Sequence, residues 1–212
     1  MFIETALTHL GKDPVLAAII AETPAPKLAD TDWRDDLYLA LLESIVSQQI
    51  SVKAADSIFR KFRLLFSDGY PAPVLLLLKT EEELRSAGLS FQKIGYLQNV
   101  AVFAQANAMD LETMLAKTDD EIIHYLTPIK GVGRWTVEML LMFVLDRPDV
   151  FPVDDLVIRQ KMVRAYPDRT ADLKGRALIK KLHEIAEPWQ PYRTLACRYL
   201  WRWKPLAITN EQ

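Results

Sequence analysis

Apolar residues recur at three- and four-residue spacing along most of this chain, which is the period of an amphipathic α-helix. Helix-capping side chains precede several of these segments, and no segment shows sustained strand alternation between hairpin turns. The sequence therefore predicts an all-α fold. Expected N-caps include Asp13, Ser51, Thr80 and Thr118. The expected helices span residues 13–22, 35–48, 51–66, 80–88, 91–106, 118–126, 134–145, 156–163, 173–187 and 192–203.

The expected helices group into two lobes. A central lobe is expected over residues 36–145, with a helix-hairpin-helix at about 119–145. The terminal segments, residues 1–35 and 146–212, are expected to form the second lobe. Because binding sites often lie where two domains meet, we expect an active-site cleft between the lobes.

Charge is unevenly distributed, although the net charge is only −2 and the isoelectric point is about 6.0. From Arg159 to Lys204 the chain has twelve lysine and arginine residues and four acidic ones, and a second basic stretch runs from Lys53 to Arg63. This asymmetry suits a protein that meets a polyanion on one face. A solvated helix face explains any single basic run equally well.

The sequence gives little support to metal or disulfide chemistry. Cys197 is the only cysteine, which excludes an internal disulfide, a thiolate zinc cluster and a four-cysteine iron–sulfur site. His9, His124 and His183 are scattered and form no ligand pair at helical spacing. We therefore expect no cofactor.

No targeting or membrane signal stands out. The N-terminus lacks a basic region followed by a long apolar run, and no segment approaches the ~20 apolar residues of a membrane span. We expect a cytoplasmic monomer, associated with the nucleoid in a bacterium, with no membrane contact and no obligate protein partner. For a eukaryotic source the compartment stays open.

The segment LTPIKGVGRWTVEMLLMF joins two predicted helices through a tight turn. Gly131 and Gly133 can take positive φ and allow another backbone to approach closely. The free amides that start the second helix, at the positive end of its dipole, can then bind a phosphate without reading sequence. Alternatively, the glycines only end one helix and start the next. The expected DNA contacts are Gly131, Val132, Gly133 and Arg134.

The same turn offers oxygen ligands. The backbone carbonyls of Thr127, Ile129 and Val132 can converge on a monovalent cation that bridges to the bound phosphate. We include this cation as a possible ligand of the turn.

Three segments, LTPIKGVGRWTVE, FPVDDLVIRQ and PWQPYRTLACRYLWRW, together resemble the helix-hairpin-helix DNA glycosylase superfamily, and within it the 3-methyladenine DNA glycosylase II family. The resemblance runs roughly from Asp36 to Trp203 and includes LESIVSQQIS near its start. It implies that the partner is damaged double-stranded DNA. Family members often carry an additional N-terminal β-domain, and this chain, which begins directly with helices, is expected to be a short form without it.

Two adjacent acids, Asp154 and Asp155, precede the apolar segment LVIRQKMV. One of them can cap the helix, which leaves the other spare. The resemblance assigns catalysis to Asp155, and we expect Asp154 to be the cap, although a one-residue shift of the alignment exchanges these roles. Cleavage of an N-glycosidic bond builds positive charge on the sugar, which a preorganised carboxylate stabilises. The same carboxylate can orient or deprotonate the attacking water.

Related enzymes that also nick the strand carry a lysine two residues after the second glycine of the hairpin, where it forms a Schiff base. This chain has Trp135 there, so the resemblance implies a monofunctional enzyme that uses water as its nucleophile. It also implies that Trp135 stacks on the flipped base, because a cationic alkylated purine favours an electron-rich ring. Without the resemblance, a lone tryptophan on an apolar helix is more often a core residue.

The remaining expected pocket residues depart from the family. Arg198 stands where a second pocket tryptophan often occurs, with Trp201 one turn later, and Leu156 stands where an aromatic residue can occur. An arginine repels a cationic base unless it points away, but it can donate hydrogen bonds to a neutral one. We expect Tyr192 and Trp201 to restore part of the aromatic surface.

Two glutamines interrupt the apolar pattern of SIVSQQISVKAA. This loop matches the segment with which family members fill the space left by a flipped base. We assign Gln49 to that space, with Gln48 and Ile50 as neighbours, and expect Lys53 to meet a phosphate of the opposite strand. A polar loop without a DNA role is the alternative.

These features predict a monofunctional DNA glycosylase that removes alkylated bases, such as 3-methyladenine and 7-methylguanine, from duplex DNA by base flipping. One alternative keeps the chemistry and changes the substrate to a neutral lesion, such as hypoxanthine or an etheno base, for which Arg198 is the cue. The other is a non-catalytic helix-hairpin-helix DNA-binding protein, which accounts for the hairpin but not for the spare acid and the tryptophan.

Overall fold

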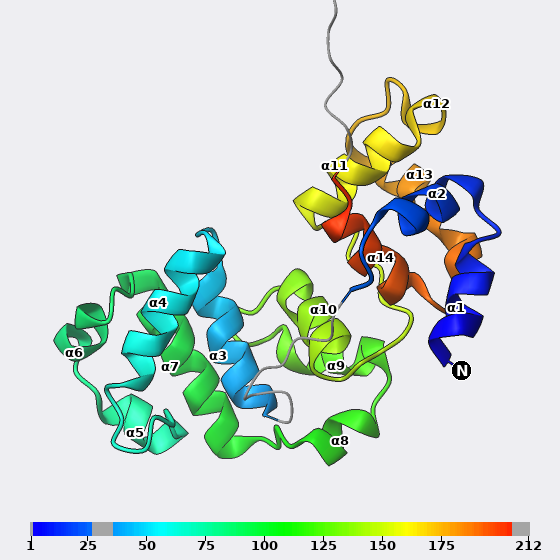
Figure 1. The fold of residues 1–212 in the computed structure, drawn as a ribbon. Helices are drawn as coiled ribbons and strands as arrows, with labels where there is room; N and C mark the ends of the chain where they lie inside the picture. Colours follow the sequence, from blue (N-terminus) through cyan, green and yellow to red (C-terminus); the bar gives the residue numbers. More distant parts are fainter. Residues whose placement is uncertain (1, 27–35, 205–212) are drawn as a thin grey trace, which may run out of the picture. The chain divides into compact units, whose positions relative to one another are not determined.

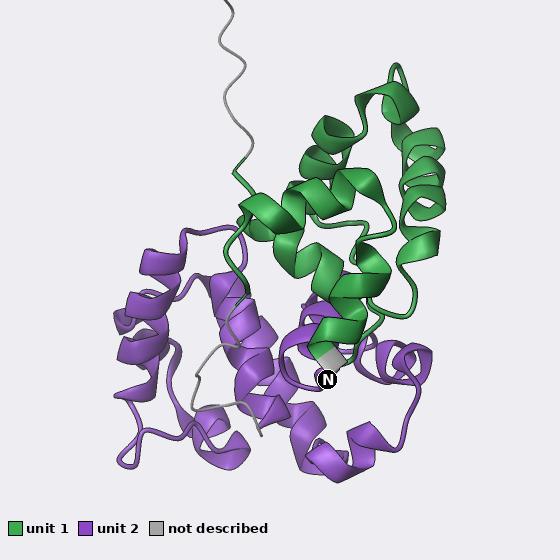
Figure 2. Cartoon of the chain, turned by 45° about the vertical axis from the view of Figure 1, so that its right-hand side comes forward, with its two compact units in different colours: residues 1–29, 147–212 green, residues 30–146 purple. Residues whose placement is uncertain are grey.

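The computed structural model describes residues 2–26 and 36–204, and every regular element among them is a helix (Figure 1). The all-α prediction is therefore confirmed. The chain divides into two compact units (Figure 2): residues 1–29 with 147–212, here called the terminal unit, and residues 30–146, the central unit. No helix in the described ranges is long and apolar enough to cross a membrane.

The part of the central unit that the structure describes, residues 36–146, holds eight helices. They are α3 (Leu37–Ser47), α4 (Val52–Arg63), α5 (Pro73–Leu78), α6 (Glu81–Ser86), α7 (Phe91–Ala106), α8 (Leu111–Leu115), α9 (Asp119–Leu126) and α10 (Arg134–Phe143). The terminal unit holds α1 (Phe2–Leu10), α2 (Pro14–Glu22), α11 (Leu156–Ala165), α12 (Pro167–Thr170), α13 (Gly175–Ala186), a 3₁₀-helix (Glu187–Trp189) and α14 (Arg193–Arg202).

The predicted caps define several of these boundaries. Thr80 and Thr118 each accept a hydrogen bond from the amide three residues later. The carboxylates of Glu83 and Glu121 in turn accept the amides of Thr80 and Thr118. Ser51 caps α4 through its hydroxyl. These reciprocal bonds satisfy amides that the helix itself leaves unpaired, so they explain why each helix begins at that residue.

The core of the central unit forms around α7 and α3. Helix α7 packs against α3, α5 and α6, while α3 also packs against α4 and α10, and α10 against α9. The apolar stripe of α3 is wide, because Leu37 to Leu42, Ile45 and Val46 are all buried. A helix covered on most of its sides provides a rigid support for the loop that follows it at residues 48–51.

Asp13 organises the core of the terminal unit. Its Oδ1 accepts the amides of Val15 and Leu16 at 3.0 and 3.1 Å, which caps α2. Its Oδ2 accepts the hydroxyl of Tyr166 at 2.7 Å and the indole Nε1 of Trp189 at 3.0 Å. One carboxylate therefore joins α2, the end of α11 and the 3₁₀-helix. Its four hydrogen-bond donors compensate for its partial burial.

An ion pair and several hydrogen bonds fix residues 147–150, the segment that leads toward α11. The Arg193 guanidinium meets the Asp149 carboxylate through Nε at 2.7 Å and through its NH2 nitrogen at 2.8 Å. The Thr194 hydroxyl donates to the carbonyl of Arg147 at 2.6 Å and accepts the amide of Val150 at 2.9 Å. Residues 147–150 are thus bound to the start of α14, and α14 also packs against α11.

Candidate functional site

The predicted hairpin joins α9 to α10. Helix α9 ends at Leu126, Thr127 is its C-cap, and Pro128 follows. The amide of Val132 donates to the carbonyl of Ile129 at 2.9 Å, and both side chains are buried. From α7, the Asn99 side-chain amide donates to the carbonyl of Lys130 at 3.1 Å. The hairpin turn is therefore fixed both from within and by α7.

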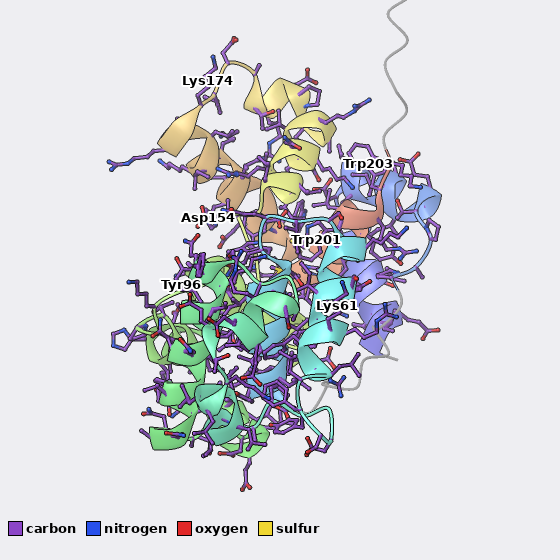
Figure 3. The ribbon with its side chains drawn as sticks, turned by 90° about the vertical axis from the view of Figure 1, so that its left-hand side faces the viewer. Lys61, Tyr96, Asp154, Lys174, Trp201 and Trp203 are labelled. Atoms are coloured by element: carbon purple, nitrogen blue, oxygen red, sulfur yellow. The ribbon has the colours of Figure 1, made fainter. Side chains whose placement is uncertain are left out.

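The two glycines of the hairpin do different things. Gly131 has φ +105°, and a Cβ placed on it would lie 2.6 Å from Cβ of Tyr96 (Figure 3), so both its conformation and its surroundings require glycine. Gly133 has φ −93° and is the N-cap of α10. Gly133 does not use the positive φ that a glycine allows, because a helix N-cap takes an extended conformation.

Gly133 leaves space at the start of α10. Within the described residues, nothing lies within 4 Å of a Cβ built on it. The glycine offers no side chain to cap the first amides of α10. Arg134 is exposed, and its Nε donates to the buried carboxylate of Glu138 at 2.9 Å. The start of α10 thus combines an open approach to the backbone with an arginine held beside it.

The loop after α3 lies against the hairpin. Gln48 donates its side-chain amide to the carbonyl of Gly131 at 3.3 Å and to the Thr136 hydroxyl at 3.4 Å. From α7, Lys93 donates to the carbonyls of Val46 and Gln48 at 2.5 and 2.9 Å, and burial lowers the pKa of Lys93. Gln48 therefore bridges the loop and the hairpin, and its contact with DNA stays a prediction.

The tip of this loop points outward. Gln49 is exposed and has φ +59°, an unusual conformation for a residue with a side chain. Ile50 is 38% exposed, and Lys53 is exposed on the first turn of α4. Val52, the first residue of α4, is 78% exposed, although its spacing places it on the same face as the buried Ala55, Phe59 and Phe62.

The acid pair lies in the terminal unit at the start of α11. Asp155 is the N-cap, with Oδ1 accepting the amide of Ile158 at 2.8 Å, and it is only 8% exposed. Asp154 is exposed. The prediction that Asp154 caps the helix was wrong, because α11 begins at Leu156 and the residue immediately before it takes the cap position. The cap and the expected catalytic acid are therefore the same residue.

The capping bond occupies only one of the roughly four lone-pair positions of the Asp155 carboxylate. A second donor reaches the same oxygen, because the indole Nε1 of Trp201 donates to Oδ1 at 3.1 Å. Trp201, labelled in Figure 3 with Asp154, lies in the last turn of α14. Two donors from different helices therefore set the direction of this carboxylate.

The other predicted pocket residues are placed differently. Leu156 is 60% exposed beside Asp155. Arg198 is partly buried one turn before Trp201 on α14. Tyr192 precedes α14, and its ring packs edge-on against His9 at 5.4 Å between centroids. Tyr192 is nine positions before Trp201, which corresponds to a rise of roughly 14 Å along the helix, and its place in the pocket stays a prediction.

Trp135 and the cation ligands lie in the central unit. Trp135 is the second residue of α10 and is partly exposed. Thr127, Ile129 and Val132 supply neutral carbonyl oxygens within one turn, a donor type that suits a monovalent cation, and the Ile129 carbonyl accepts one amide and keeps a second lone pair. No cluster of three or more His, Cys, Asp or Glu able to hold a metal occurs among the described residues.

The hairpin, with its glycine-started helix, defines a helix-hairpin-helix protein. A family model for HhH-GPD superfamily base excision DNA repair proteins matches residues 42–188. The chain belongs to this superfamily.

Several named proteins of this superfamily are similar to the chain. The chain is 37% identical over 172 residues to "DNA-3-methyladenine glycosylase 1" of Schizosaccharomyces pombe, covering 80% of this chain and 73% of the relative. It is 30% identical over 239 residues to "DNA-3-methyladenine glycosylase" of Saccharomyces cerevisiae, covering 95% and 78%. Among solved structures, the S. pombe 3-methyladenine DNA glycosylase in complex with abasic DNA matches with TM-score 0.79 and 32% identity, covering 93% of this chain and 95% of the other.

Proposed function

We propose that this chain is a monofunctional DNA glycosylase that hydrolyses the N-glycosidic bond of alkylated bases, including 3-methyladenine and 7-methylguanine, in duplex DNA. The observation that carries the proposal is the buried Asp155 carboxylate, held by the amide of Ile158 and the indole of Trp201. Relatives named as 3-methyladenine glycosylases support the substrate class.

Asp155 acts on the positive charge of the transition state. As the bond between base and sugar breaks, the sugar becomes oxocarbenium-like, and a carboxylate whose direction is already fixed stabilises that charge without reorganising. The same carboxylate orients the water that attacks the sugar, or takes its proton. An alkylated purine is cationic and leaves readily, so the site needs little assistance from a general acid.

Trp135 determines the type of product. A strand-cleaving relative would need an amine at this position to form a Schiff base, and an indole has no nucleophilic nitrogen of that kind. Water is therefore the nucleophile, and the product is an intact strand with an abasic site. The partly exposed indole also provides a π face on which a cationic base can stack.

The central unit holds the DNA. The amides that start α10 bind a phosphate beside Gly133, and the carbonyls of Thr127, Ile129 and Val132 would hold a monovalent cation whose charge neutralises the same phosphate. Gln49 fills the space that the flipped base leaves, with Ile50 at its side. Lys53 meets a phosphate of the opposite strand, so binding weakens as salt rises.

A second candidate substrate is a neutral lesion such as hypoxanthine or an etheno base. It is favoured by Arg198, which lies one helical turn from Trp201, the residue bonded to Asp155. A guanidinium there repels a cationic base and can donate hydrogen bonds to the edge of a neutral one. The proposal also takes the protein to act as a monomer in the cytoplasm, without an obligate protein partner.

Chromatography of the bases released from methylated duplex DNA tests the proposal. We expect 3-methyladenine and 7-methylguanine to appear faster than in a reaction without protein, with the strand unbroken until alkali is added. Parallel oligonucleotides that contain hypoxanthine or ethenoadenine decide between the two substrate classes. Tight binding of duplex DNA with no base released from any of these substrates would leave a DNA-binding protein without catalysis.

A further inference from the structure

Lys161 lies on α11, six residues after Asp155, and reaches the end of α14. Its ammonium donates to the backbone carbonyls of Trp201 at 2.6 Å and Trp203 at 2.7 Å. The last carbonyls of a helix have no partner within the helix and carry the negative end of its dipole, so a cation is well matched to them. Lys161 therefore caps the C-terminal end of α14 from a neighbouring helix.

Lys161 occupies a position where an apolar residue would be expected. Ile158 and Met162 are fully buried, and Lys161 lies between them on the same stripe of α11. Burial lowers the pKa of Lys161, and the charge of Asp155 acts in the opposite direction. A partly buried ammonium is costly unless its donors are satisfied, and here two carbonyls accept two of its three N–H groups.

A chain of contacts connects this ammonium to the carboxylate. Lys161 holds the backbone of Trp201, and the Trp201 indole donates to Oδ1 of Asp155. The path closes through α11 itself, since Asp155 caps the helix that carries Lys161. The indole bond is 3.1 Å long, so a shift of the last turn of α14 by about 1 Å would break it or turn the carboxylate.

We propose that Lys161 is a positioning residue for base release. By holding the last turn of α14, it sets the place of the Trp201 indole and so fixes the direction of the Asp155 carboxylate. This inference rests on the proposed catalytic role of Asp155. Lys161 acts through Trp201 and does not itself touch the DNA base.

The test compares four variants under single-turnover conditions on methylated DNA. Lys161→Met keeps most of the length and removes both hydrogen bonds. Lys161→Arg keeps the charge and the donors, and Trp201→Phe keeps a ring without the N–H group. We expect Lys161→Met and Trp201→Phe each to slow base release roughly 10- to 100-fold, because a 1 Å misplacement can cost about 100-fold. Lys161→Arg should restore most of the rate. The fourth variant combines Lys161→Met with Trp201→Phe and should be no slower than the slower single variant.

Two further readouts separate positioning from a general structural role. Affinity for DNA that contains an abasic analogue should change less than about threefold, because the phosphate contacts are untouched. The indole ¹H–¹⁵N resonance that Trp201→Phe removes should shift in Lys161→Met and in Asp155→Asn. Lys12→Met, which removes an exposed lysine of the same unit, is the matched control and should leave both the rate and the resonance unchanged.

Base release by Lys161→Met at the parent rate would overturn the inference, and so would a slower rate with an unmoved resonance. If Lys161→Met is poorly folded, an active Lys161→Arg together with a slow, folded Trp201→Phe supports the inference, and a fully active Trp201→Phe overturns it. Asp155→Asn separates the two proposals. If Asp155→Asn abolishes release while Lys161→Met does not slow it, only the positioning role fails; if Asp155→Asn releases base normally, the proposed catalytic role fails as well.

Discussion

Gln48 and Gly131 are joined by a hydrogen bond that spans 83 residues of sequence, from the side-chain amide of the glutamine to the carbonyl of the glycine. This bond connects the loop that we expect to enter the DNA with the turn that we expect to grip its backbone. The same amide reaches Thr136 in the first turn of α10. Loop and hairpin are thus held as one assembly within the central unit.

Gln48→Ala tests this coupling. Both bonds are long, 3.3 and 3.4 Å, so we expect the free energy of unfolding to fall by only about 1 kcal/mol. Base release should fall further than affinity for undamaged duplex, because the hairpin still grips phosphate while the loop is less well placed. Gln105→Ala, a change at an exposed glutamine of α7, is the control and should alter neither quantity. Equal losses in affinity and release would argue against the coupling.

Changing the two hairpin glycines to alanine should affect different properties: Gly131→Ala should lower stability, and Gly133→Ala should lower DNA affinity. Gly131→Ala forces a methyl group into Tyr96 and a side chain into φ +105°, so we expect a loss of about 2 kcal/mol or more in the free energy of unfolding. Gly133→Ala has open space and an ordinary φ, so its loss should stay within about 1 kcal/mol. Its DNA affinity should nevertheless fall, because the methyl group stands in front of the first amides of α10. Denaturant titration measures the change in the free energy of unfolding of both variants, and a DNA-binding assay measures the change in their affinity.

Gln49→Gly should separate stability from activity. A glycine accepts φ +59° without cost, so the free energy of unfolding should stay the same or rise by up to about 1 kcal/mol. Base release should nevertheless fall by about tenfold or more, since nothing fills the space that the flipped base leaves. The measurement is single-turnover release beside a denaturant titration. If Gln49→Gly stays active, another residue fills the space left by the flipped base, and the exposed Ile50 and Val52 are the nearest candidates.

Glu43 should make the stability of the central unit depend on pH. Burial, and then the charge of Asp56, raise the pKa of this α3 carboxyl to about 7, and its Oε2 is buried with no hydrogen-bond partner in the described ranges. Since the folded-state pKa lies above the unfolded value of 4.5, the stabilising effect of the protonated form is present below pH 4.5 and is lost as pH rises through 7. Solvent reaches part of this carboxyl and screens its charge, so Glu43→Gln should raise the free energy of unfolding by only about 1–2 kcal/mol at pH 8 and change it little at pH 4.5. Equal effects at both pH values would contradict the assignment.

The sequence predicted the longer helices well, because periodicity and capping side chains act locally. The expected residue ranges did not include α1, α5, α8 or α12. Three of these are only four to six residues long, too short to show a helical period, and the sequence of α5, PVLLLL, is apolar without a pattern. In α5 only Leu76 is buried, while Leu75 and Leu78 are exposed.

The site was harder to predict, because its side chains are placed by contacts between distant segments. Periodicity cannot show that Gln48 reaches Gly131 or that Trp201 reaches Asp155. Nor can two adjacent acids reveal which one caps a helix, because this depends on where the helix begins. Lys161 did leave a signal, since it is a charged residue on the buried stripe of α11, but an apolar stripe does not say which carbonyls such a lysine would meet.

Asp155→Asn tests the central claim most directly. Asparagine keeps the size of the side chain and an oxygen that can cap α11, but it removes the negative charge that the developing sugar cation needs. We predict that this variant binds DNA containing an abasic analogue with near-parent affinity and releases 3-methyladenine from methylated DNA at least about 1,000-fold more slowly. Release at a rate close to that of the parent protein, from a folded variant, would contradict the account.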